Sequence, residues 1–193
     1  ALLSSNLFHK NLTTDILNFP TDLYIMEGLK KTFQIPQITL VKYPNEIEAD
    51  IEILKNSIKK NPGIICLSMV SYKSAFLYPV QLLNRWAAKN NSIIVWDLSH
   101  AVGAVAINLK VAEVKIALGC TYKYMNGGPG APAFLFVDND LQPNLFNPIQ
   151  GWFGHHRPFD FNMNFIPADG IDRFAAGTPS VLSIAGIEAG IDL

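Results

Sequence analysis

The sequence has 193 residues and a mass of 21.3 kDa, which is the size of one ordinary domain. Hydrophobic residues make up 49% of it and charged residues only 16%, a balance that excludes intrinsic disorder. The formal net charge is −1 and the sequence contains no basic block, which argues against an electrostatic nucleic-acid binder. The low charged fraction indicates that a partner subunit or further chain covers part of the surface.

The two cysteines, Cys66 and Cys120, lie in apolar surroundings without a CxxC spacing. We therefore interpret both as reduced core residues of an intracellular protein. No apolar run approaches the roughly 20 residues of a membrane span, and no signal-peptide pattern occurs, so we expect a cytoplasmic protein. The chain begins at Ala1 without a methionine and ends at Leu193 in an apolar, helix-like stretch, which predicts a piece of a longer protein.

A first helix is predicted after Pro44, with Asn45 as its N-cap. Apolar residues recur at helical spacing on one face of it, namely Ile47, Ile51, Leu54 and Ile58. Asn-Pro-Gly at 61–63 ends the helix. The apolar run 64–69 follows at once and is typical of a strand that is buried on both faces.

A second helix is predicted from Pro79 to Asn90, and the apolar run 93–96 after it predicts another buried strand. Strand, helix and strand at this spacing form a βαβ unit, so we expect a parallel sheet and an α/β fold class. A further strand is expected at 134–137, and Thr-Pro at 178–179 is typical of the start of a last helix.

Asp97 comes directly after the strand 93–96. Ligands of open parallel sheets bind outside the carboxyl ends of the strands, so this position favours a role in a site. A buried carboxylate needs a cationic or hydrogen-bonding partner, and a helix cap or an arginine partner is the alternative interpretation. His100 follows three residues later and can return to the same crevice, although a lone histidine is equally typical of the core or the surface.

Lys123 lies between Tyr122 and Tyr124, close to the apolar run 116–118. A lysine beside an apolar core can lose its charge and become a nucleophile, whereas a solvated surface lysine is the alternative. The Gly-Gly-Pro-Gly run at 127–130 has neither the ending of a P-loop nor the spacing of a dinucleotide fingerprint, so it predicts a rigid turn.

Asp97 and Lys123 together match the needs of a pyridoxal phosphate site. The aspartate keeps the pyridine nitrogen protonated, and the lysine forms a Schiff base with the cofactor. Phe19 can cover the face of the ring, although plain core packing is its alternative interpretation. Candidate donors to the phosphate are Ser4, Ser68, Tyr122 and Trp152.

Four segments of the sequence resemble the kynureninase family. They are Phe-Pro-Thr-Asp-Leu-Tyr at 19–24, Asp-Leu-Ser-His-Ala-Val-Gly at 97–103, Tyr-Lys-Tyr-Met-Asn-Gly-Gly-Pro-Gly-Ala-Pro at 122–132 and Gly-Trp-Phe-Gly-His at 151–155. The resemblance implies a three-layer α/β sandwich with a mainly parallel sheet, the large domain of a fold-type-I pyridoxal phosphate transferase. Residues 1–193 would be that domain in incomplete form, without the family's N-terminal segment and C-terminal small domain.

The resemblance also implies roles for individual residues. Lys123 would bind the cofactor covalently, Asp97 would pair with its ring nitrogen, and Phe19 would stack on the ring. The implied catalytic residues are Lys123, Asp97, Tyr122 and His100. The implied cofactor-binding residues are Leu3, Ser4, Phe19, Pro20, Thr21, Asp22, Ser68, Asp97, His100, Tyr122, Lys123, Trp152 and Thr178. Of these, Tyr122, Ser68 and the backbone of Leu3 and Ser4 would bind the phosphate, whereas Trp152 and Thr178 would reach the neighbouring subunit's site in a homodimer.

The activity implied is hydrolysis of the Cβ–Cγ bond of L-kynurenine or 3-hydroxykynurenine to anthranilate or 3-hydroxyanthranilate and L-alanine, in tryptophan catabolism and NAD biosynthesis. A cysteine desulfurase-like or aminotransferase-like enzyme of the same fold, and an inactive cofactor-domain fragment, remain alternatives. A metal-dependent hydrolase is a further alternative, but its candidate ligands follow no short ligand motif, and we predict no metal. Those candidate ligands are Asp97, His100, His155, His156 and Asp169.

Overall fold

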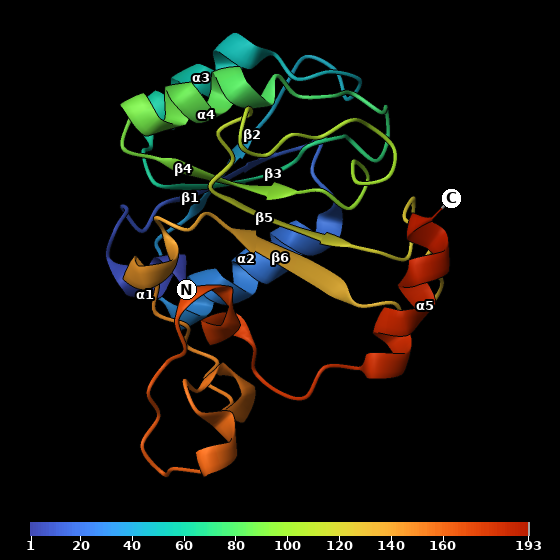
Figure 1. Ribbon diagram of the computed structural model, residues 1–193. Helices are drawn as coiled ribbons and strands as arrows, with labels where there is room; N and C mark the ends of the chain where they lie inside the picture. Colours follow the sequence, from blue (N-terminus) through green and yellow to red (C-terminus); the bar gives the residue numbers. More distant parts are fainter. Residues whose placement is uncertain (193) are drawn as a thin grey trace.

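The computed structural model describes residues 1–192, which form a central six-stranded sheet in the order β2-β1-β3-β4-β5-β6 (Figure 1). The strands are β1 (Leu12–Asp15), β2 (Ile38–Val41), β3 (Ile64–Ser68), β4 (Ile93–Asp97), β5 (Ile116–Cys120) and β6 (Ala133–Val137). Neighbouring strands pair in parallel except β5 and β6, which pair antiparallel. The predicted α/β class with a mainly parallel sheet is confirmed.

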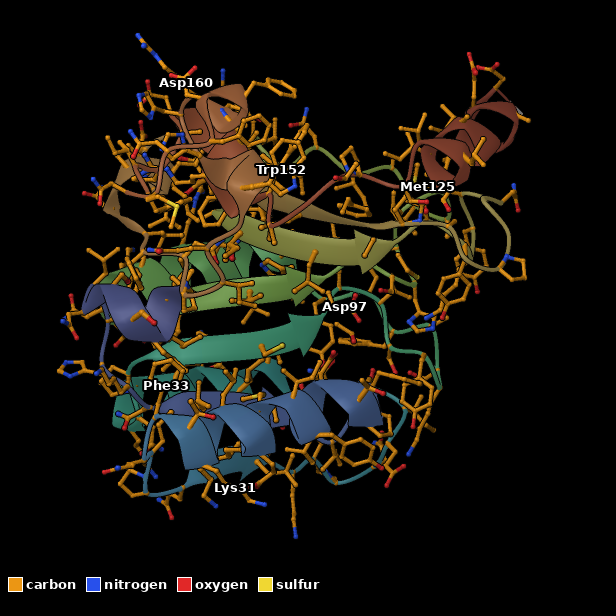
Figure 2. All side chains as sticks on the ribbon, turned by 90° about the horizontal axis from the view of Figure 1, so that it is seen from below. Lys31, Phe33, Asp97, Met125, Trp152 and Asp160 are labelled. Atoms are coloured by element: carbon orange, nitrogen blue, oxygen red, sulfur yellow. The ribbon has the colours of Figure 1, made fainter. Side chains whose placement is uncertain are left out.

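Helices cover both faces of this sheet. Helices α3 (Ile51–Lys60) and α4 (Val80–Lys89) lie on one face, and α2 (Pro20–Thr32) lies on the other (Figures 1 and 2). The result is the three-layer sandwich that we expected. Two further helices, α1 (Leu2–Ser5) and α5 (Val181–Ile191), lie near the ends of the chain. No helix of residues 1–192 combines the length and the apolar character that a membrane crossing requires.

Between β6 and α5 the chain forms an irregular lobe, residues 141–173, that projects from the sandwich (Figure 1). Its regular structure is limited to short 3₁₀ turns. They are Gln142–Asn144, Trp152–Gly154, Pro158–Asp160 and the start of Gly170–Phe174. Arg173 ties the end of the lobe to its beginning by donating from Nη1 to the Gln142 carbonyl at 2.8 Å.

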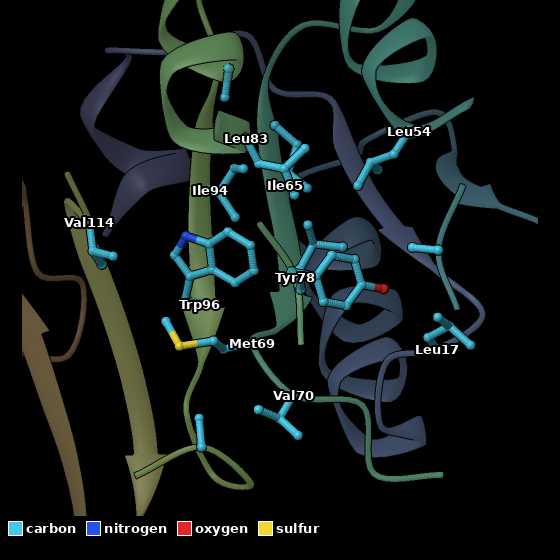
Figure 3. Close-up of a cluster of buried hydrophobic side chains, with 14 of the residues drawn as sticks. Leu17, Leu54, Ile65, Met69, Val70, Tyr78, Leu83, Ile94, Trp96 and Val114 are labelled. Atoms are coloured by element: carbon cyan, nitrogen blue, oxygen red, sulfur yellow. The ribbon is translucent and has the colours of Figure 1, made fainter. Parts of the chain in front are cut away.

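The alternation of side chains along β3 and β4 separates the core from the site. Ile65, Leu67 and Trp96 point to the α3/α4 face, where they belong to one buried cluster with Leu54 and Leu83. Figure 3 shows Ile65, Trp96, Leu54 and Leu83 in this cluster. All five side chains are 0% exposed, and each such burial stabilises the fold by about 1.5–3 kcal/mol. The alternate residues of both strands point to the α2 face, and this second set ends in polar side chains.

The predicted start of the helix after Pro44 is wrong. Helix α3 begins at Ile51, because the Asp50 carboxylate accepts hydrogen bonds at 3.0 Å from the backbone N–H groups of Glu52 and Ile53. Asn45 does cap the chain, but it closes a separate turn by accepting from the Ile47 N–H at 2.8 Å. The predicted end of the helix is correct, since Lys60 is its last residue.

Candidate active site

The carboxyl ends of β3, β4 and β5 lie side by side, and each ends in a polar or sulfur-bearing residue. Ser68 is paired with Asp97 in the parallel register of β3 and β4, so both side chains point to the α2 face. Asp97 is 6% exposed, and its Oδ1 atom accepts a hydrogen bond from the Ser99 N–H at 2.8 Å. Figure 2 shows Asp97 at the strand end. The predicted placement of this carboxylate is therefore correct.

Lys123 lies on the loop that follows β5. The loop turns back on itself because the Asn126 N–H donates to the Lys123 carbonyl at 3.0 Å, and the Gly127 N–H donates to the Thr121 carbonyl at 2.9 Å. This turn brings the Lys123 Nζ atom to 3.0 Å from His100 Nε2. The structure thus brings together two residues that were predicted separately from the sequence.

The His100 ring is placed to accept a hydrogen bond from Lys123. Burial, and after it the positive charge of Lys123, lower the pKa of His100 below its ordinary value, while Asp97 opposes that shift. The neutral ring can accept a hydrogen bond from the Lys123 ammonium group at Nε2 and then carries its hydrogen at Nδ1. Nδ1 is buried and has no hydrogen-bond partner within residues 1–192.

Asp22 adds a second carboxylate to the site from the first turn of α2. Its Oδ2 atom is buried and has no hydrogen-bond partner in the described part of the chain. Burial and the negative charge of Asp97 raise the pKa of Asp22 to about 6, and Lys123 opposes the shift. A carboxyl group in this state needs a donor that residues 1–192 do not supply.

Phe19 and Tyr72 form an aromatic wall beside Lys123. The Lys123 Nζ atom lies 5.5 Å from the centre of the Phe19 ring. The Tyr72 ring meets Phe19 edge-on, with ring centres 5.1 Å apart and planes at 87°, and both rings lie within 6.3 Å of the His100 ring. Phe19 is 37% exposed, so one part of the ring is free to cover a ligand. Tyr72 was not among the residues predicted from the sequence, although its place just after β3, at the same end of the strands, was an available signal.

These groups fit pyridoxal phosphate. Lys123 supplies an amine for the cofactor's aldehyde, Asp97 a buried carboxylate for its ring nitrogen, and Phe19 an aromatic face for its ring. The unpartnered Asp22 Oδ2 and His100 Nδ1 atoms are the buried polar atoms of a site that a polar ligand completes.

Other predicted cofactor residues lie around this cluster. Pro20 and Thr21 follow Phe19 in the first turn of α2. Tyr122 is 50% exposed, and its ring centre lies 5.6 Å from Lys123 Nζ, so its hydroxyl group is accessible. The Ser68 hydroxyl donates its proton to the Asn18 side chain at 2.5 Å, so in this arrangement Ser68 can offer a phosphate no proton.

The predicted contacts of Leu3 and Ser4 with the cofactor phosphate are wrong. Both residues belong to α1, and Leu3 packs in the cluster that contains Leu12 and Ile64, the first residues of β1 and β3. Helix α1 therefore lies at the amino ends of the strands, opposite Asp97 (Figure 2). The physical reason is that β1 runs from the amino ends of the parallel strands to their carboxyl ends. Residues that precede β1 therefore start at the end opposite the site.

Trp152 and Thr178 stand apart from the Lys123 cluster. Trp152 packs in the lobe against Phe153, Phe159 and Phe161, with ring centres 4.9 to 6.5 Å apart, and is 40% exposed. Thr178 is exposed in the segment between the lobe and α5. Their role in a neighbouring subunit's site stays a prediction.

The alternative metal site is not brought together. His155 lies in the lobe, where its Nδ1 accepts from the Arg157 N–H at 2.9 Å and its Nε2 pairs with the Asn164 carbonyl at 3.1 Å. Both ring nitrogens are thus occupied, and Asp97 and His100 lie at the strand ends. Within residues 1–192, histidine, cysteine and acidic side chains form no group of three or more that is placed to hold a metal ion.

The chain has the fold of the fold-type-I pyridoxal phosphate-dependent enzymes. The chain belongs to the aminotransferase class-V family, whose sequence model matches residues 26–193. This membership confirms the predicted fold class and cofactor.

Individual relatives fall into two groups. Kynureninase from Pseudomonas fluorescens is 38% identical over 183 residues, which are 94% of this chain and 42% of that protein. Among solved structures, the cysteine desulfurase of Thermococcus onnurineus NA1 superposes with a TM-score of 0.75 at 20% identity, over 94% of this chain and 44% of that one. A mutant of C-DES, with glycine covalently linked to its PLP cofactor, gives a TM-score of 0.79 at 14% identity, over 99% and 51%. The chain thus spans about two fifths to one half of the length of the proteins that it resembles. It shares the fold of the two solved structures.

Proposed function

We propose that the chain is the large, cofactor-binding domain of a kynureninase. The enzyme would use water to cleave the Cβ–Cγ bond of L-kynurenine or 3-hydroxykynurenine, giving L-alanine and anthranilate or 3-hydroxyanthranilate. The similarity to kynureninase from Pseudomonas fluorescens supports the substrate class. The single structural observation that supports it most is the convergence of Lys123, His100, Asp97 and Phe19 at one edge of the sheet.

Each residue of this cluster has a distinct task in the proposal. When bound, pyridoxal phosphate supplies an electron sink conjugated with the substrate's α-carbon. Asp97 would hold the proton of a ring nitrogen, and Phe19 would cover one ring face. Lys123 Nζ would bind the cofactor covalently and act as the base toward the proton on the substrate's α-carbon. The neutral His100 Nε2, at 3.0 Å, orients that amine by accepting its hydrogen bond.

The overall reaction balances with one water molecule. Water adds to the ketone carbon Cγ, the Cβ–Cγ bond breaks, and Cβ takes a proton to become the methyl group of alanine. We assign that proton donation to Tyr122, whose accessible phenol lies next to Lys123. Normal turnover by a Tyr122→Phe variant would remove this assignment.

The assembly is part of the same proposal. We infer a homodimer in the cytoplasm in which Trp152 and Thr178 reach the neighbouring subunit's site. The exposed positions of both residues, away from Lys123, support this arrangement. Size-exclusion chromatography with light scattering tests the dimer, and a monomer at micromolar concentration would contradict it.

A cysteine desulfurase is the second candidate because the fold is like that of the Thermococcus enzyme. That chemistry needs an accessible thiolate. Burial raises the pKa of the Cys66 thiol to about 12, so this cysteine stays protonated at neutral pH. Cys120 is fixed at the end of β5, where it is only partly accessible. Neither described cysteine has the properties of a mobile nucleophile.

The deciding experiment gives L-kynurenine to the full-length protein loaded with pyridoxal phosphate and follows anthranilate fluorescence. A Lys123→Ala variant should lose both release and cofactor colour, whereas the exposed Lys110→Ala variant should keep both. A parallel assay with L-cysteine follows sulfide release. Sulfide without anthranilate would replace the proposal by the desulfurase, and a protein that never binds the cofactor would refute both.

A further inference from the structure

The Asn18 side chain connects β1, β3 and the start of α2 by hydrogen bonds. The side chain is buried, with 7% of the residue exposed. Its Nδ2 atom donates to the Thr14 hydroxyl at 3.0 Å and to the Cys66 carbonyl at 3.1 Å. Its Oδ1 atom accepts from the Phe19 N–H at 3.1 Å and from the Ser68 hydroxyl at 2.5 Å. Every donor and acceptor of the carboxamide is therefore engaged.

The directions of these hydrogen bonds are fixed by two backbone groups. The Cys66 carbonyl can only accept, so it must face the amide nitrogen of Asn18. The Phe19 N–H can only donate, so it must face the amide oxygen. Ser68 also meets that oxygen, which commits the single proton of its hydroxyl group to Asn18. Ser68 then presents only lone pairs to a ligand, which is the wrong polarity for a phosphate oxygen.

Asn18 also contacts the backbone of Phe19, one of the two rings of the aromatic wall. Phe19 is the N-cap residue of α2, and its backbone N–H donates to the Asn18 carboxamide oxygen at 3.1 Å. The first turn of α2 carries Asp22 as well. A shift of this junction would move the ring face and the second carboxylate together.

We propose that Asn18 is a positioning residue of the cofactor site, which holds Phe19 and the Ser68 hydroxyl in place and itself touches no ligand. Ser68 is then a donor to Asn18 rather than a phosphate ligand. This inference rests on the proposed pyridoxal phosphate site. It predicts that losing Asn18 weakens the binding of the cofactor's ring, with or without its phosphate.

The experiment compares Asn18→Ala, Ser68→Ala and the double variant with a matched control, Asn84→Ala, in the full-length protein. Asn84 also bridges two partners, because it accepts from Trp96 Nε1 at 2.9 Å and donates to the Ala112 carbonyl at 2.8 Å, but it lies on the α3/α4 face. For each protein, the affinities for pyridoxal phosphate and for pyridoxal are measured by fluorescence titration. The visible circular dichroism of the bound cofactor reports the orientation of its ring, and thermal unfolding reports stability.

We expect Asn18→Ala to weaken both ligands by the same factor, about tenfold, which corresponds to about 1.4 kcal/mol, and to change the circular dichroism band. Ser68→Ala should show a smaller loss of the same kind. The double variant should bind no more weakly than Asn18→Ala, because the two residues act through one hydrogen bond. Asn84→Ala should lower only the unfolding temperature.

Two results would overturn the inference. One is an Asn18→Ala protein that is less stable but keeps the affinities and the circular dichroism band, which would make Asn18 purely structural. The other is a loss confined to pyridoxal phosphate, which would make Ser68 a phosphate ligand. If Asn18→Ala does not fold, Ser68→Ala decides: an equal loss for both ligands supports the inference, and no loss overturns it.

The failure of the proposed function is visible separately in the wild-type protein. Wild-type protein that binds the cofactor but releases no anthranilate refutes the substrate alone, and the comparison of variants is unaffected. Wild-type protein that binds neither ligand refutes the site, and the inference falls with it.

Discussion

Replacing Asp22 by asparagine is expected to stabilise the cofactor-free protein at neutral pH. The carboxylate has a buried oxygen atom, Oδ2, without a hydrogen-bond partner in the described part of the chain. The negative charge of Asp97 also repels its ionised form. Both effects penalise the ionised form, which is why the pKa of Asp22 rises from 3.8 to about 6. Asparagine removes the charge and keeps the shape of the side chain.

The size of the expected stabilisation follows from the rise in the pKa of Asp22. About two pKa units at about 1.36 kcal/mol each correspond to about 3 kcal/mol, and partial contact with solvent reduces this to about 1–2 kcal/mol. Since the folded state binds the proton more tightly than the unfolded state, the penalty is absent below about pH 4 and grows as the pH rises. It reaches its full size above about pH 6, the pKa of Asp22 in the folded protein.

Urea unfolding at about pH 4 and about pH 7.5 measures the effect. The Asp22→Asn protein should exceed the wild type by about 1–2 kcal/mol at the higher pH and match it at the lower one. Asp140→Asn, at an exposed carboxylate, should change neither value. The reasoning is refuted if Asp22→Asn equals or falls below the wild type at about pH 7.5, or if the difference does not depend on pH.

Three further outcomes follow from contacts outside the cluster. Tyr78→Phe removes the 2.6 Å hydrogen bond to the buried carboxylate of Asp15 and should lower the free energy of unfolding by about 1–3 kcal/mol in urea titrations. Gly103→Ala should weaken cofactor binding in equilibrium dialysis, because Gly103 has a φ of +81° and an added Cβ would overlap the Tyr124 carbonyl on the Lys123 loop. The Cys66 thiol, with its pKa raised to about 12 by burial, should resist alkylation in the native protein and react only after unfolding, as peptide mass spectrometry would show.

The Tyr78 and Gly103 predictions each have a control variant in the chain. Tyr24→Phe, at a side chain that is 69% exposed, should leave the free energy of unfolding unchanged. Gly177→Ala, where an added Cβ meets nothing within 4 Å, should leave cofactor binding unchanged. Alkylation of Cys66 in the native protein at the rate of a free thiol would contradict its raised pKa.

The positions of Asp97 and Lys123 at the carboxyl ends of the strands could be predicted, because hydrophobic periodicity and sheet topology both point to them. Asp97 follows a strand whose apolar run is continuous, and the βαβ spacing makes that strand parallel, so its end had to face the ligand edge. Lys123 could be placed because it follows the next strand of the sheet. The resemblance to kynureninases then assigned the tasks, since no periodic pattern distinguishes a cofactor lysine from a surface lysine.

The features that could not be predicted from the sequence were missed for physical reasons. β1 and β2 contain four residues each, which is too short for an alternating pattern to stand out. Without β1 in the prediction, nothing placed Leu3 and Ser4 at the opposite edge. Asn18 could not be recognised, because its partner Ser68 is distant in sequence and only the folded chain brings the two together.

The register of β3 against β4 also has a consequence for evolution. Because Ser68 and Asp97 share the α2 face with the alternate apolar residues of their strands, inserting or deleting one residue within β4 would turn the carboxylate to the opposite face and expel Trp96 from the core. Single-residue insertions or deletions in the strands that end at the site are therefore expected to be strongly destabilising. The lobe of residues 141–173 lies outside the sheet ladder and is free of this restriction. New specificities in this architecture can thus arise by changing loop length, while the strand ends stay fixed.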